Sequence, residues 1–533
     1  MPDWFEKIPV GELPAWAATR WAEREALVFA GRRWRFGELA TAVDAAAKGF
    51  MALGIAPGER VGLWAVNSPT WMVAMFALAK IGAIFVPINS RLRTTDVAYI
   101  LGQSESCAVL INARSGPVDY LAMVREMGAD AAELPHLRHT VLLDEAAQPG
   151  TIGWPELHEQ GRAISDAALA ERAAAVDPDG LLYIMYTSGT TGFPKGAMHT
   201  HNVVRNVVDQ CNRMAVTFND VLLTNMPLFH VLAYFEGPLL SMVSGARQVL
   251  MEGFEPEESL DLIAQESVTM FHGFDFNFKA LLAAQARKPR DMSSLRMGIC
   301  GAGMASSTEV AYQANEVFMP TVSGFGMTEI GIGAALGTLT DTPEQRCETS
   351  GYPLPGYEFR IVDPATDAPL PAGTEGEIQL RGYMVTQGYY KKPEETERAF
   401  APGRWLRTGD MGYLRPDGYV RLLGRYKDMI KVGGENVDPL EVENFLLSHP
   451  AVQQVAVVSA PDEKLTEVGV AFVVPEPGHT LTAADVDRFC RGKLAGFKIP
   501  RHLVLVESFP FTGSGKVQKF KLREQALAAL GKG

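Results

Sequence analysis

The sequence contains one stretch that constrains its architecture more than any other, namely Tyr186-Thr187-Ser188-Gly189-Thr190-Thr191-Gly192-Phe193-Pro194-Lys195-Gly196. An apolar run over 181–186, typical of a buried strand, precedes it. A helical pattern begins near Asn202, with the valines at 203, 204, 207 and 208 on one face. The glycines and proline of the quoted stretch favour a tight loop with exposed backbone N–H groups, its hydroxyls add donors, and Lys195 adds a positive charge. This succession of strand, loop and helix therefore predicts a binding site for a polyphosphate. The spacing of the glycines and the lysine in the loop differs from that of the Walker P-loop.

The segment before this loop alternates between helical and strand patterns. Helices are predicted over 40–53 and 70–81, and strands over 60–66 and 83–88. Residues 112–178 are rich in Ala, Asp, Glu and Pro and are predicted to be mainly loop. Strand and helix units resume at residue 181 and continue to about residue 336. The predicted fold class is therefore α/β, with covered and mostly parallel sheets.

The pattern changes after residue 350, where short segments are typical of antiparallel strands. Strands are predicted over 357–362, 376–381 and 413–423, and the last contains the turn Arg415-Pro416-Asp417-Gly418. This part is predicted to be a small β-rich, barrel-like subdomain. The rest of the chain returns to a mixed α+β pattern, with strands predicted over 453–459, 468–474 and 502–506.

Composition and charge narrow the class of protein. The chain has 533 residues, of which 47% are hydrophobic and 21% charged, a composition that excludes a disordered protein. Its 49 Lys and Arg face 62 Asp and Glu, and the net charge of −13 disfavours nucleic acid and anionic membranes as main partners. The acidic excess lies before Arg425, because the segment from Arg425 onward has a net charge of +1. Small-molecule partners are expected, and the oligomeric state stays open, with a homodimer as one alternative.

Three further features bear on location. The five cysteines are odd in number and far apart, so a disulfide framework is not expected and a reducing compartment fits better. The first residues lack the basic and apolar segments of a secretion signal. The longest apolar run, over 71–88, is interrupted by Lys80, Gly82 and Pro87, so it is predicted to be a buried helix followed by a strand. We therefore expect a cytoplasmic protein without an integral membrane segment.

Five short motifs follow the loop in a fixed order. They are Pro227-Leu228-Phe229-His230, Gly324-Phe325-Gly326-Met327-Thr328-Glu329, Trp405-Leu406-Arg407-Thr408-Gly409-Asp410, Gly424-Arg425-Tyr426-Lys427-Asp428-Met429-Ile430-Lys431-Val432-Gly433-Gly434-Glu435-Asn436 and Gly513-Ser514-Gly515-Lys516-Val517. With these motifs, nearly the whole sequence resembles the adenylate-forming enzymes, a superfamily of acyl- and aryl-CoA synthetases, peptide-synthetase adenylation domains and luciferases. Among these it is most similar to the fatty-acyl-CoA synthetases.

The resemblance implies an ATP-dependent acid–CoA ligase that forms AMP. A thiol cannot displace oxide from a carboxylate, whereas attack by the carboxylate on the α-phosphate of ATP gives an acyl-adenylate with a good leaving group. That step brings anions together, so the site must supply cations and hydrogen-bond donors where charge develops. The implied cofactors are therefore ATP, Mg²⁺ and coenzyme A.

The resemblance also assigns roles to individual residues. Lys516 would be the catalytic lysine that bridges the carboxylate and the α-phosphate, and Thr328 would donate to that phosphate. Glu329 would coordinate Mg²⁺, which takes oxygen ligands, and His230 would lie beside the acyl carboxylate. The residues expected to bind ATP are Thr187, Ser188, Gly189, Thr190, Thr191, Gly192, Lys195, Gly301, Ala302, Gly324, Phe325, Gly326, Met327, Thr328, Asp410 and Arg425.

Three residues of this set would contact the nucleoside. Phe325 would stack on adenine, at a position where the family most often has Tyr. Asp410 would accept hydrogen bonds from both ribose hydroxyls, and Arg425 would donate to the same region.

The motif that begins at Gly424 is implied to join two domains. The predicted large domain spans 1–424, with the β-rich subdomain at about 340–424, and residues 425–428 form a hinge before a small, mobile α+β domain at 429–533. The small domain would rotate about Lys427 between the two half-reactions. Lys431, Gly433 and Gly434 would then contact CoA, where the glycines allow close backbone approach.

By the resemblance, the acyl group is expected to lie among residues 231–237, 273–278, 301–304 and 324–333, which contain several small residues and are called the predicted acyl wall. The pocket residues implied are His230, Val231, Gly273, Phe274, Gly301, Gly303 and Gly331. These segments leave room for a long apolar group and contain no basic residue to pair with a second carboxylate. We predict a medium- or long-chain fatty acid, with an aryl or alicyclic acid as the alternative substrate and a carrier-protein thiol as the alternative acceptor.

Other functions fit the sequence less well. Gly301-Ala302-Gly303-Met304-Ala305-Ser306 lacks the third glycine of a dinucleotide-binding turn. A nucleotide sensor without catalysis would not need Lys516. The sequence contains no G-x-S-x-G nucleophile elbow, which argues against an α/β-hydrolase. His199 and His201 have no adjoining third ligand for a metal, so this pair is interpreted as the lead into the following helix.

Overall fold

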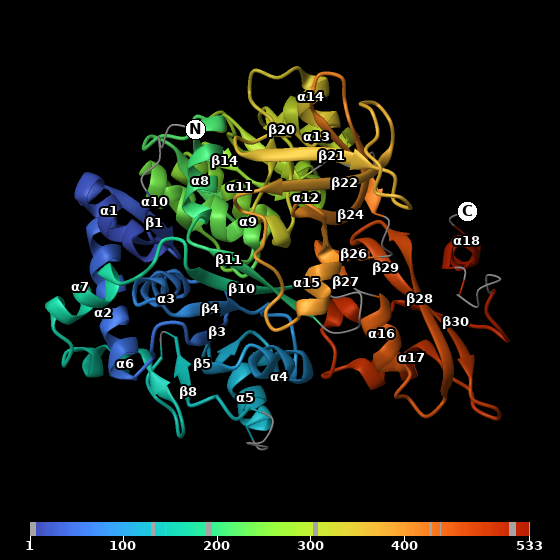
Figure 1. Cartoon of the computed structure of the whole chain (residues 1–533), viewed down its shortest axis with the longest axis horizontal. Coiled ribbons are helices and arrows are strands. Elements are labelled where there is room, and N and C mark those ends of the chain that lie inside the picture. Colours follow the sequence, from blue (N-terminus) through green and yellow to red (C-terminus); the bar gives the residue numbers. More distant parts are fainter. Residues whose placement is uncertain are drawn as a thin grey trace. The chain divides into compact units, whose positions relative to one another are not determined.

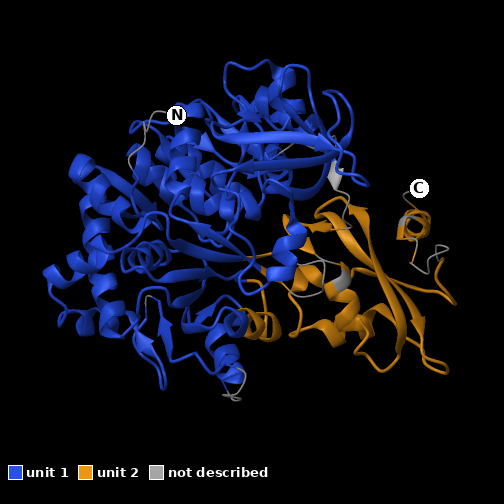
Figure 2. Cartoon of the chain, in the orientation of Figure 1, with its two compact units in different colours: residues 1–90, 101–185, 196–424 blue, residues 91–100, 186–195, 425–533 orange. Residues whose placement is uncertain are grey.

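The computed structural model describes residues 7–128, 134–143, 145–187, 194–301, 308–425, 429–437, 439–510, 517 and 519–531. The chain divides into two compact units, which Figure 2 shows in different colours. Unit 1 comprises residues 1–90, 101–185 and 196–424, and unit 2 comprises residues 91–100, 186–195 and 425–533.

The first sheet has seven strands in the order β11-β10-β4-β3-β5-β8-β9. Its members are β3 (Arg60–Trp64), β4 (Ile84–Pro87), β5 (Ser106–Ile111), β8 (His139–Leu142), β9 (Ile152–Gly153), β10 (Leu181–Thr187) and β11 (Lys195–Thr200). The pairs from β10 through to β9 are parallel. Every residue of β4 and β5 is buried, as expected of strands covered on both faces.

Seven α-helices occur among the described residues up to residue 180. They are α1 (Leu13–Trp21), α2 (Phe36–Ala52), α3 (Pro69–Lys80), α4 (Thr94–Gln103), α5 (Tyr120–Met127), α6 (Trp154–Gly161) and α7 (Asp166–Ala174). Helix α2 packs against α1, α3 and α6, and Figure 1 shows this group beside the sheet. The Ser68 hydroxyl caps α3 by accepting a hydrogen bond from the Trp71 N–H. The apolar run over 71–88 thus forms a buried helix and then a strand, as predicted.

Residues 112–178 are not mainly loop, and that prediction is wrong. They contain β8, β9, α5, α6 and α7 among shorter elements. The helices are short, and only four residues of α5 and two each of α6 and α7 are buried. Their apolar stripes are therefore too narrow to stand out from a background of Ala and acidic residues. Side-chain caps at Asp119 and Ser165 fix two of the helix starts.

A second, five-stranded sheet has the order β14-β12-β13-β1-β2. Its strands are β1 (Glu25–Phe29), β2 (Arg32–Arg35), β12 (Val221–Thr224), β13 (Arg247–Leu250) and β14 (Met270–Phe271). All its pairs are parallel except β1 with β2. The helices that connect this part are α8 (Val203–Arg213), α9 (Val231–Tyr234), the π-helix η2 (Phe235–Leu239), α10 (Leu240–Ser244), α11 (Pro256–Glu266) and α12 (Asp275–Arg287).

Two small sheets and the β-rich part complete unit 1. One small sheet contains β15 (Gly273–Phe274), β16 (Gly298–Gly301) and β17 (Thr321–Val322). The other contains β18 (Gly324–Phe325), β19 (Ala335–Leu336) and β20 (Tyr352–Pro353). The helices in this part are α13 (Thr308–Val317) and α14 (Pro343–Glu348). The antiparallel β-rich sheet contains β21 (Tyr357–Val362), β22 (Gly376–Gly382), β23 (Phe400–Ala401), β24 (Trp405–Leu414) and β25 (Val420–Arg425), with helix α15 (Pro393–Ala399). The predicted strand over 413–423 is the end of β24, a turn and the start of β25. Gly418 adopts a φ of 85° in that turn.

Unit 2 contains a separate sheet with the order β27-β26-β29-β28, and β30 pairs with β29. Its elements are β26 (Ile430–Val432), β27 (Glu435–Val437), α16 (Pro439–Leu446), β28 (Val452–Asp462), β29 (Thr466–Pro475), α17 (Ala483–Cys490), β30 (His502–Leu505) and α18 (Lys519–Ala529). Helices α16 and α17 share one apolar cluster with the sheet, and α18 belongs to another. Within this unit the buried Lys498 Nζ lies 3.0 Å from Asp96 and 2.6 Å from Glu441.

Two further observations bear on the predictions of location. Across the described ranges, no helix has both the length and the apolar character that a membrane crossing requires. All five cysteines are free and buried.

Candidate functional site

A tight turn in unit 1 carries several of the predicted site residues. Strands β18 and β19 pair antiparallel, and a short 3-10 helix at Thr328–Ile330 lies between them. A Cβ atom at Gly326 would lie 2.0 Å from the Ile332 carbonyl oxygen, so only glycine fits there. The turn therefore holds Thr328 and Glu329 close to the backbone of the returning strand.

Glu329 is buried and held by two partners. The Tyr389 hydroxyl donates a hydrogen bond of 3.0 Å to Glu329 Oε1, and the Thr386 N–H donates one of 2.7 Å to the Glu329 carbonyl oxygen. Burial raises the pKa of Tyr389 above its ordinary value, so its hydroxyl stays protonated and remains a donor. This carboxylate is therefore oriented before any ligand binds.

Thr328 is anchored by His199. The His199 Nε2 lies 2.6 Å from the Thr328 carbonyl oxygen, and the imidazole stacks on Tyr183 with 5.0 Å between ring centres. Burial lowers the pKa of His199 to about 4, so the ring is neutral at physiological pH. Because a carbonyl oxygen only accepts, Nε2 carries the proton. His199 lies in β11 and is thus not simply the lead into a helix.

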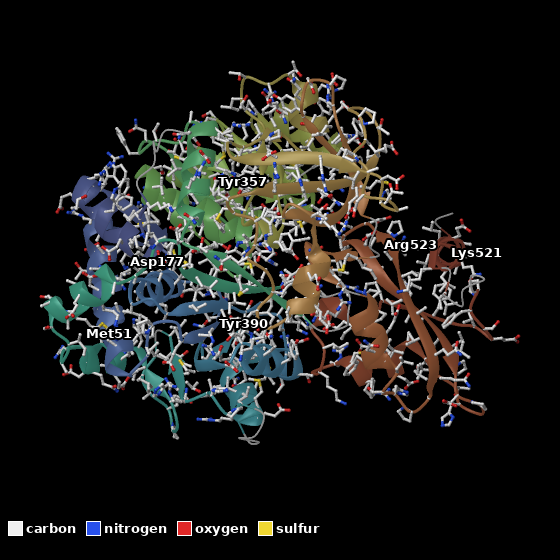
Figure 3. The ribbon with its side chains drawn as sticks, viewed as in Figure 1. Met51, Asp177, Tyr357, Tyr390, Lys521 and Arg523 are labelled. Atoms are coloured by element: carbon white, nitrogen blue, oxygen red, sulfur yellow. The ribbon has the colours of Figure 1, made fainter. Side chains whose placement is uncertain are left out.

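Helix α8 supports the same turn with buried amide side chains. Asn206 Nδ2 donates 2.9 Å to the Gly333 carbonyl oxygen and 3.1 Å to the Tyr357 hydroxyl, and Gln210 Nε2 donates 2.9 Å to Asn206 Oδ1. Tyr357, which Figure 3 labels, is the first residue of β21. The valine pattern predicted this helix, but nothing in it signalled that the amide residues would be buried and bonded to a motif loop.

Phe325 is a core residue in this structure. Its ring is 3% exposed and meets Phe359 edge to face, with 5.8 Å between ring centres. The predicted stacking of Phe325 on adenine stays a prediction.

Asp410 lies within β24, where it is buried. The preceding Gly409 has a φ of 69° and donates its N–H to Glu377 Oε1 at 2.9 Å. The Thr408 hydroxyl donates to the Ile378 carbonyl oxygen at 2.6 Å and accepts from the Asp410 N–H at 3.0 Å. The Thr-Gly-Asp motif therefore forms an irregular, internally bonded segment that fixes the aspartate backbone.

The structure brings several predicted acyl-pocket segments together. Gly273 and Phe274 of β15 pair with Cys300 and Gly301 of β16. A Cβ at Gly301 would lie 2.5 Å from the Phe274 ring, which explains the glycine there.

A second group of pocket residues follows the histidine motif. His230 is the N-cap of α9, which begins at Val231. A Cβ at Gly331 would lie 3.9 Å from the ring of Phe235, in the adjoining π-helix. The turn that carries Glu329 thus also reaches the predicted acyl wall.

Some predicted residues belong to unit 2. Thr187 is the last residue of β10, and Lys195 is a buried residue that begins β11. Lys431 pairs with Asn436 across the β26–β27 hairpin. Gly433 and Gly434 have φ values of 57° and 87°, so they form the two-residue turn of that hairpin, which favours glycine at both positions.

Several predicted residues lie outside the described parts of the chain. They are Ser188, Gly189, Thr190, Thr191, Gly192, Ala302, Gly303, Lys427, Lys516 and the side chain of Arg425. Of the residues that are described, no three His, Cys, Asp or Glu side chains gather as they would around a protein-bound metal ion.

A cavity of about 190 Å³ lies elsewhere in unit 1. Its lining comes from Asp179, Met198, His199, Thr200, Asn202, Tyr383, Met384, Val385 and Gln387. Its lining includes none of the residues predicted to bind ATP, CoA or the acyl group, and the lining residue His199 contacts the Thr328 carbonyl oxygen.

The comparisons with known proteins agree with the sequence motifs. Residues 14–390 match the family model described as "AMP-binding enzyme", and residues 441–516 match its C-terminal domain. The chain is 33% identical to a mitochondrial medium-chain acyl-CoA ligase of Mus musculus, over 97% of this chain and 87% of that protein. It is 35% identical to 3-[(3aS,4S,7aS)-7a-methyl-1,5-dioxo-octahydro-1H-inden-4-yl]propanoyl:CoA ligase of Rhodococcus jostii (strain RHA1), over 96% and 97% of the two chains.

Solved structures show the same fold. A double mutant of o-succinylbenzoate CoA synthetase from Bacillus subtilis, bound with its product analogue OSB-NCoA, superimposes with a TM-score of 0.80 at 25% identity. The match covers 97% of this chain and 98% of that one. This likeness confirms the predicted α/β class, with a large N-terminal part and a smaller C-terminal part. The chain therefore belongs to the AMP-binding enzyme family, the adenylate-forming acyl-CoA synthetases and ligases.

Proposed function

We propose that this protein joins a carboxylic acid to coenzyme A, with cleavage of ATP to AMP and pyrophosphate. One observation carries the proposal. The turn from Gly324 to Gly333 contains Thr328 and Glu329, which the motif assigns to the nucleotide, and Gly331, at which an added Cβ would lie 3.9 Å from the ring of Phe235 in the predicted acyl wall. We infer that this one loop serves both the phosphate to be attacked and the acid that attacks it.

In the first half-reaction, a carboxylate oxygen forms a bond to the α-phosphorus as the bond to the bridging oxygen of pyrophosphate breaks. The Thr328 hydroxyl donates to the α-phosphate, and Glu329, held by Tyr389, would hold Mg²⁺. When bound, the ion neutralises phosphate charge. Asp410 would hold the ribose hydroxyls, and Lys195 with the 187–192 loop would bind the outer phosphates. Lys516 would neutralise the charge that develops between acid and phosphate.

In the second half-reaction, the thiol of CoA attacks the acyl carbon and AMP leaves. The Gly433-Gly434 turn has no side chains and so allows close approach of the pantetheine arm. We further propose that the boundary between the domains lies at 425–428 and that the small domain rotates about Lys427. Lys427→Pro would then preserve adenylate formation and impair thioester formation, and equal retention of both activities would contradict the rotation.

The substrate is proposed to be a medium- or long-chain fatty acid, as in the name of the mouse relative. The alternative is an alicyclic or aryl acid, which the names of the Rhodococcus and Bacillus proteins support. A carrier-protein thiol remains the alternative acceptor. The five free cysteines support a reducing location, which we propose to be the cytoplasm, and a homodimer is the alternative to a monomer.

Pyrophosphate release tests the proposal. The purified protein is supplied with ATP and Mg²⁺ and with octanoic, palmitic, benzoic or 3-cyclohexylpropanoic acid, each with and without CoA. Release that depends on the acid, and an acyl-CoA product that needs CoA, are the expected results. Release without any acid, or none with every acid, would contradict the proposed function.

A further inference from the structure

Two titratable side chains are buried at the predicted acyl wall and have no assigned role. Glu236 is 4% exposed and His272 is 3% exposed. The Glu236 Oε2 lies 3.8 Å from the His272 Nε2, too far for a hydrogen bond between them. Among the described residues, neither atom has a hydrogen-bond partner. A buried polar atom without a partner is costly, so such a pair calls for an explanation.

The pair lies where the acyl segments meet. Glu236 belongs to the π-helix η2, directly after Phe235, whose ring would lie 3.9 Å from a Cβ added at Gly331. His272 directly precedes Gly273, on the segment that joins β14 to β15. Insertions of this helix type occur often at functional sites. Glu236 and His272 therefore face each other across segments already expected to surround the acyl group.

The protonation states make both groups hydrogen-bond donors. His272 Nδ1 accepts a hydrogen bond of 3.1 Å from the Ile299 N–H, so the proton of the neutral ring is on Nε2. Burial, aided by the charge of Arg296, lowers the pKa of His272 to about 3. Burial raises the pKa of Glu236 to about 8, so near neutral pH most of this carboxyl group is protonated.

Two neutral donors whose atoms lie 3.8 Å apart can both bond one acceptor that approaches from beside the pair and has two lone pairs, such as a ketone oxygen. We propose that Glu236 and His272 determine acyl specificity by jointly donating hydrogen bonds to a carbonyl oxygen carried on the body of the substrate acid. This inference rests on the proposed function and narrows it to oxo-substituted acids. A plain hydrocarbon would leave both donors unpaired, and sites built to bond a polar group reject analogues that lack it.

Matched pairs of acids test the inference in the unaltered protein. Octanoic acid is compared with 5-, 6- and 7-oxooctanoic acid, and 3-cyclohexylpropanoic acid with 3-(4-oxocyclohexyl)propanoic acid, by pyrophosphate release. We expect kcat/KM for the best oxo acid to exceed that of its parent by about tenfold or more. Equal values within every pair would overturn the inference while leaving the proposed function intact. Lack of release with every acid would contradict both.

Variants then assign the effect to the pair. Glu236→Leu and His272→Phe should each lower kcat/KM for the oxo acid about tenfold or more and leave the parent acid unchanged or improved. Glu236→Gln keeps a hydrogen-bond donor and should keep much of the preference for the oxo acid. This conservative variant also provides a test if Glu236→Leu does not fold. Glu316→Leu, on the exposed face of α13, is the matched control. Equal losses for oxo and parent acids would show a merely structural role and overturn the inference.

Discussion

Tyr389 and Glu329 are joined by a buried hydrogen bond of 3.0 Å from the tyrosine hydroxyl to Oε1 of the carboxylate. The two residues are 60 positions apart in the sequence, and Tyr389 lies outside every motif of the chain. The geometry makes Tyr389 a positioning residue for the carboxylate that would hold the metal ion. Such outer partners fix the orientation of metal ligands.

Tyr389→Phe should therefore lower the apparent affinity for Mg²⁺ without abolishing Mg²⁺ binding. A hydrogen bond to a charged group contributes about 1.5–3 kcal/mol, so we expect about a tenfold or larger loss of kcat/KM at low Mg²⁺. Titration of pyrophosphate release with Mg²⁺ measures this, and high Mg²⁺ should recover part of the loss. A variant with the Mg²⁺ dependence of the unaltered protein would contradict the role of Tyr389.

Gly326→Ala should distort the turn that carries Thr328 and Glu329. The added Cβ would meet the Ile332 carbonyl oxygen at 2.0 Å, so the backbone must move. Overpacking of this kind costs about 1–3 kcal/mol. We expect a lower Tm by calorimetry and a fall in kcat/KM for ATP.

Gly253→Ala is the control for that change, because no atom lies within 4 Å of its added Cβ. This variant should keep both Tm and activity. If Gly326→Ala behaved like Gly253→Ala, the turn would not be as rigid as the structure indicates.

Stability should depend on pH through Glu236. The folded state holds its proton up to a pKa of about 8, whereas the ordinary value is 4.5. Between these values the folded state binds more protons than the unfolded state, so stability falls as pH rises through this window and levels off above it. Glu236→Gln cannot ionise and should lack this loss.

Calorimetry of the two proteins at several pH values measures the difference. The Tm of Glu236→Gln relative to the unaltered protein should increase steadily from about pH 4.5 to about pH 8 and then stay constant. A Tm difference that did not change across this range would show that Glu236 is ionised in the folded protein.

Lys516→Ala should separate the two half-reactions. Loss of one group that stabilises developing charge costs about 10²–10³ in rate by analogy with oxyanion holes. The rate of adenylate formation, measured by pyrophosphate release, should fall by this factor. The rate of thioester formation from supplied acyl-adenylate should stay near normal. Lys464→Ala, at an exposed position between β28 and β29, is the control. Equal losses in both half-reactions would contradict the proposed role.

The sequence predicted those features that depend on local pattern. Alternation alone placed β21 at its observed bounds, and the valine spacing indicated α8. The motif from Gly324 to Glu329 was predicted to form part of the site, and the structure shows why its glycines are needed.

Features that depend on tertiary contact could not be predicted in the same way. Asn206 and Gln210 look like ordinary polar helix residues, and only their burial against Gly333 shows their role. Glu236 and His272 lie on two segments that the chain connects by way of α10, β13, α11 and β14. A pattern in the sequence reports which face of an element is apolar, but not which distant side chain covers it.

The central claim is that the acid attacks the α-phosphate of ATP, and oxygen-18 in the carboxylate of an accepted acid tests it most directly. After single turnovers with CoA, mass spectrometry locates the label. Each turnover should place one labelled oxygen in AMP and none in pyrophosphate. Label in inorganic phosphate, with ADP as the nucleotide product, would show attack at the outer phosphate and contradict the account.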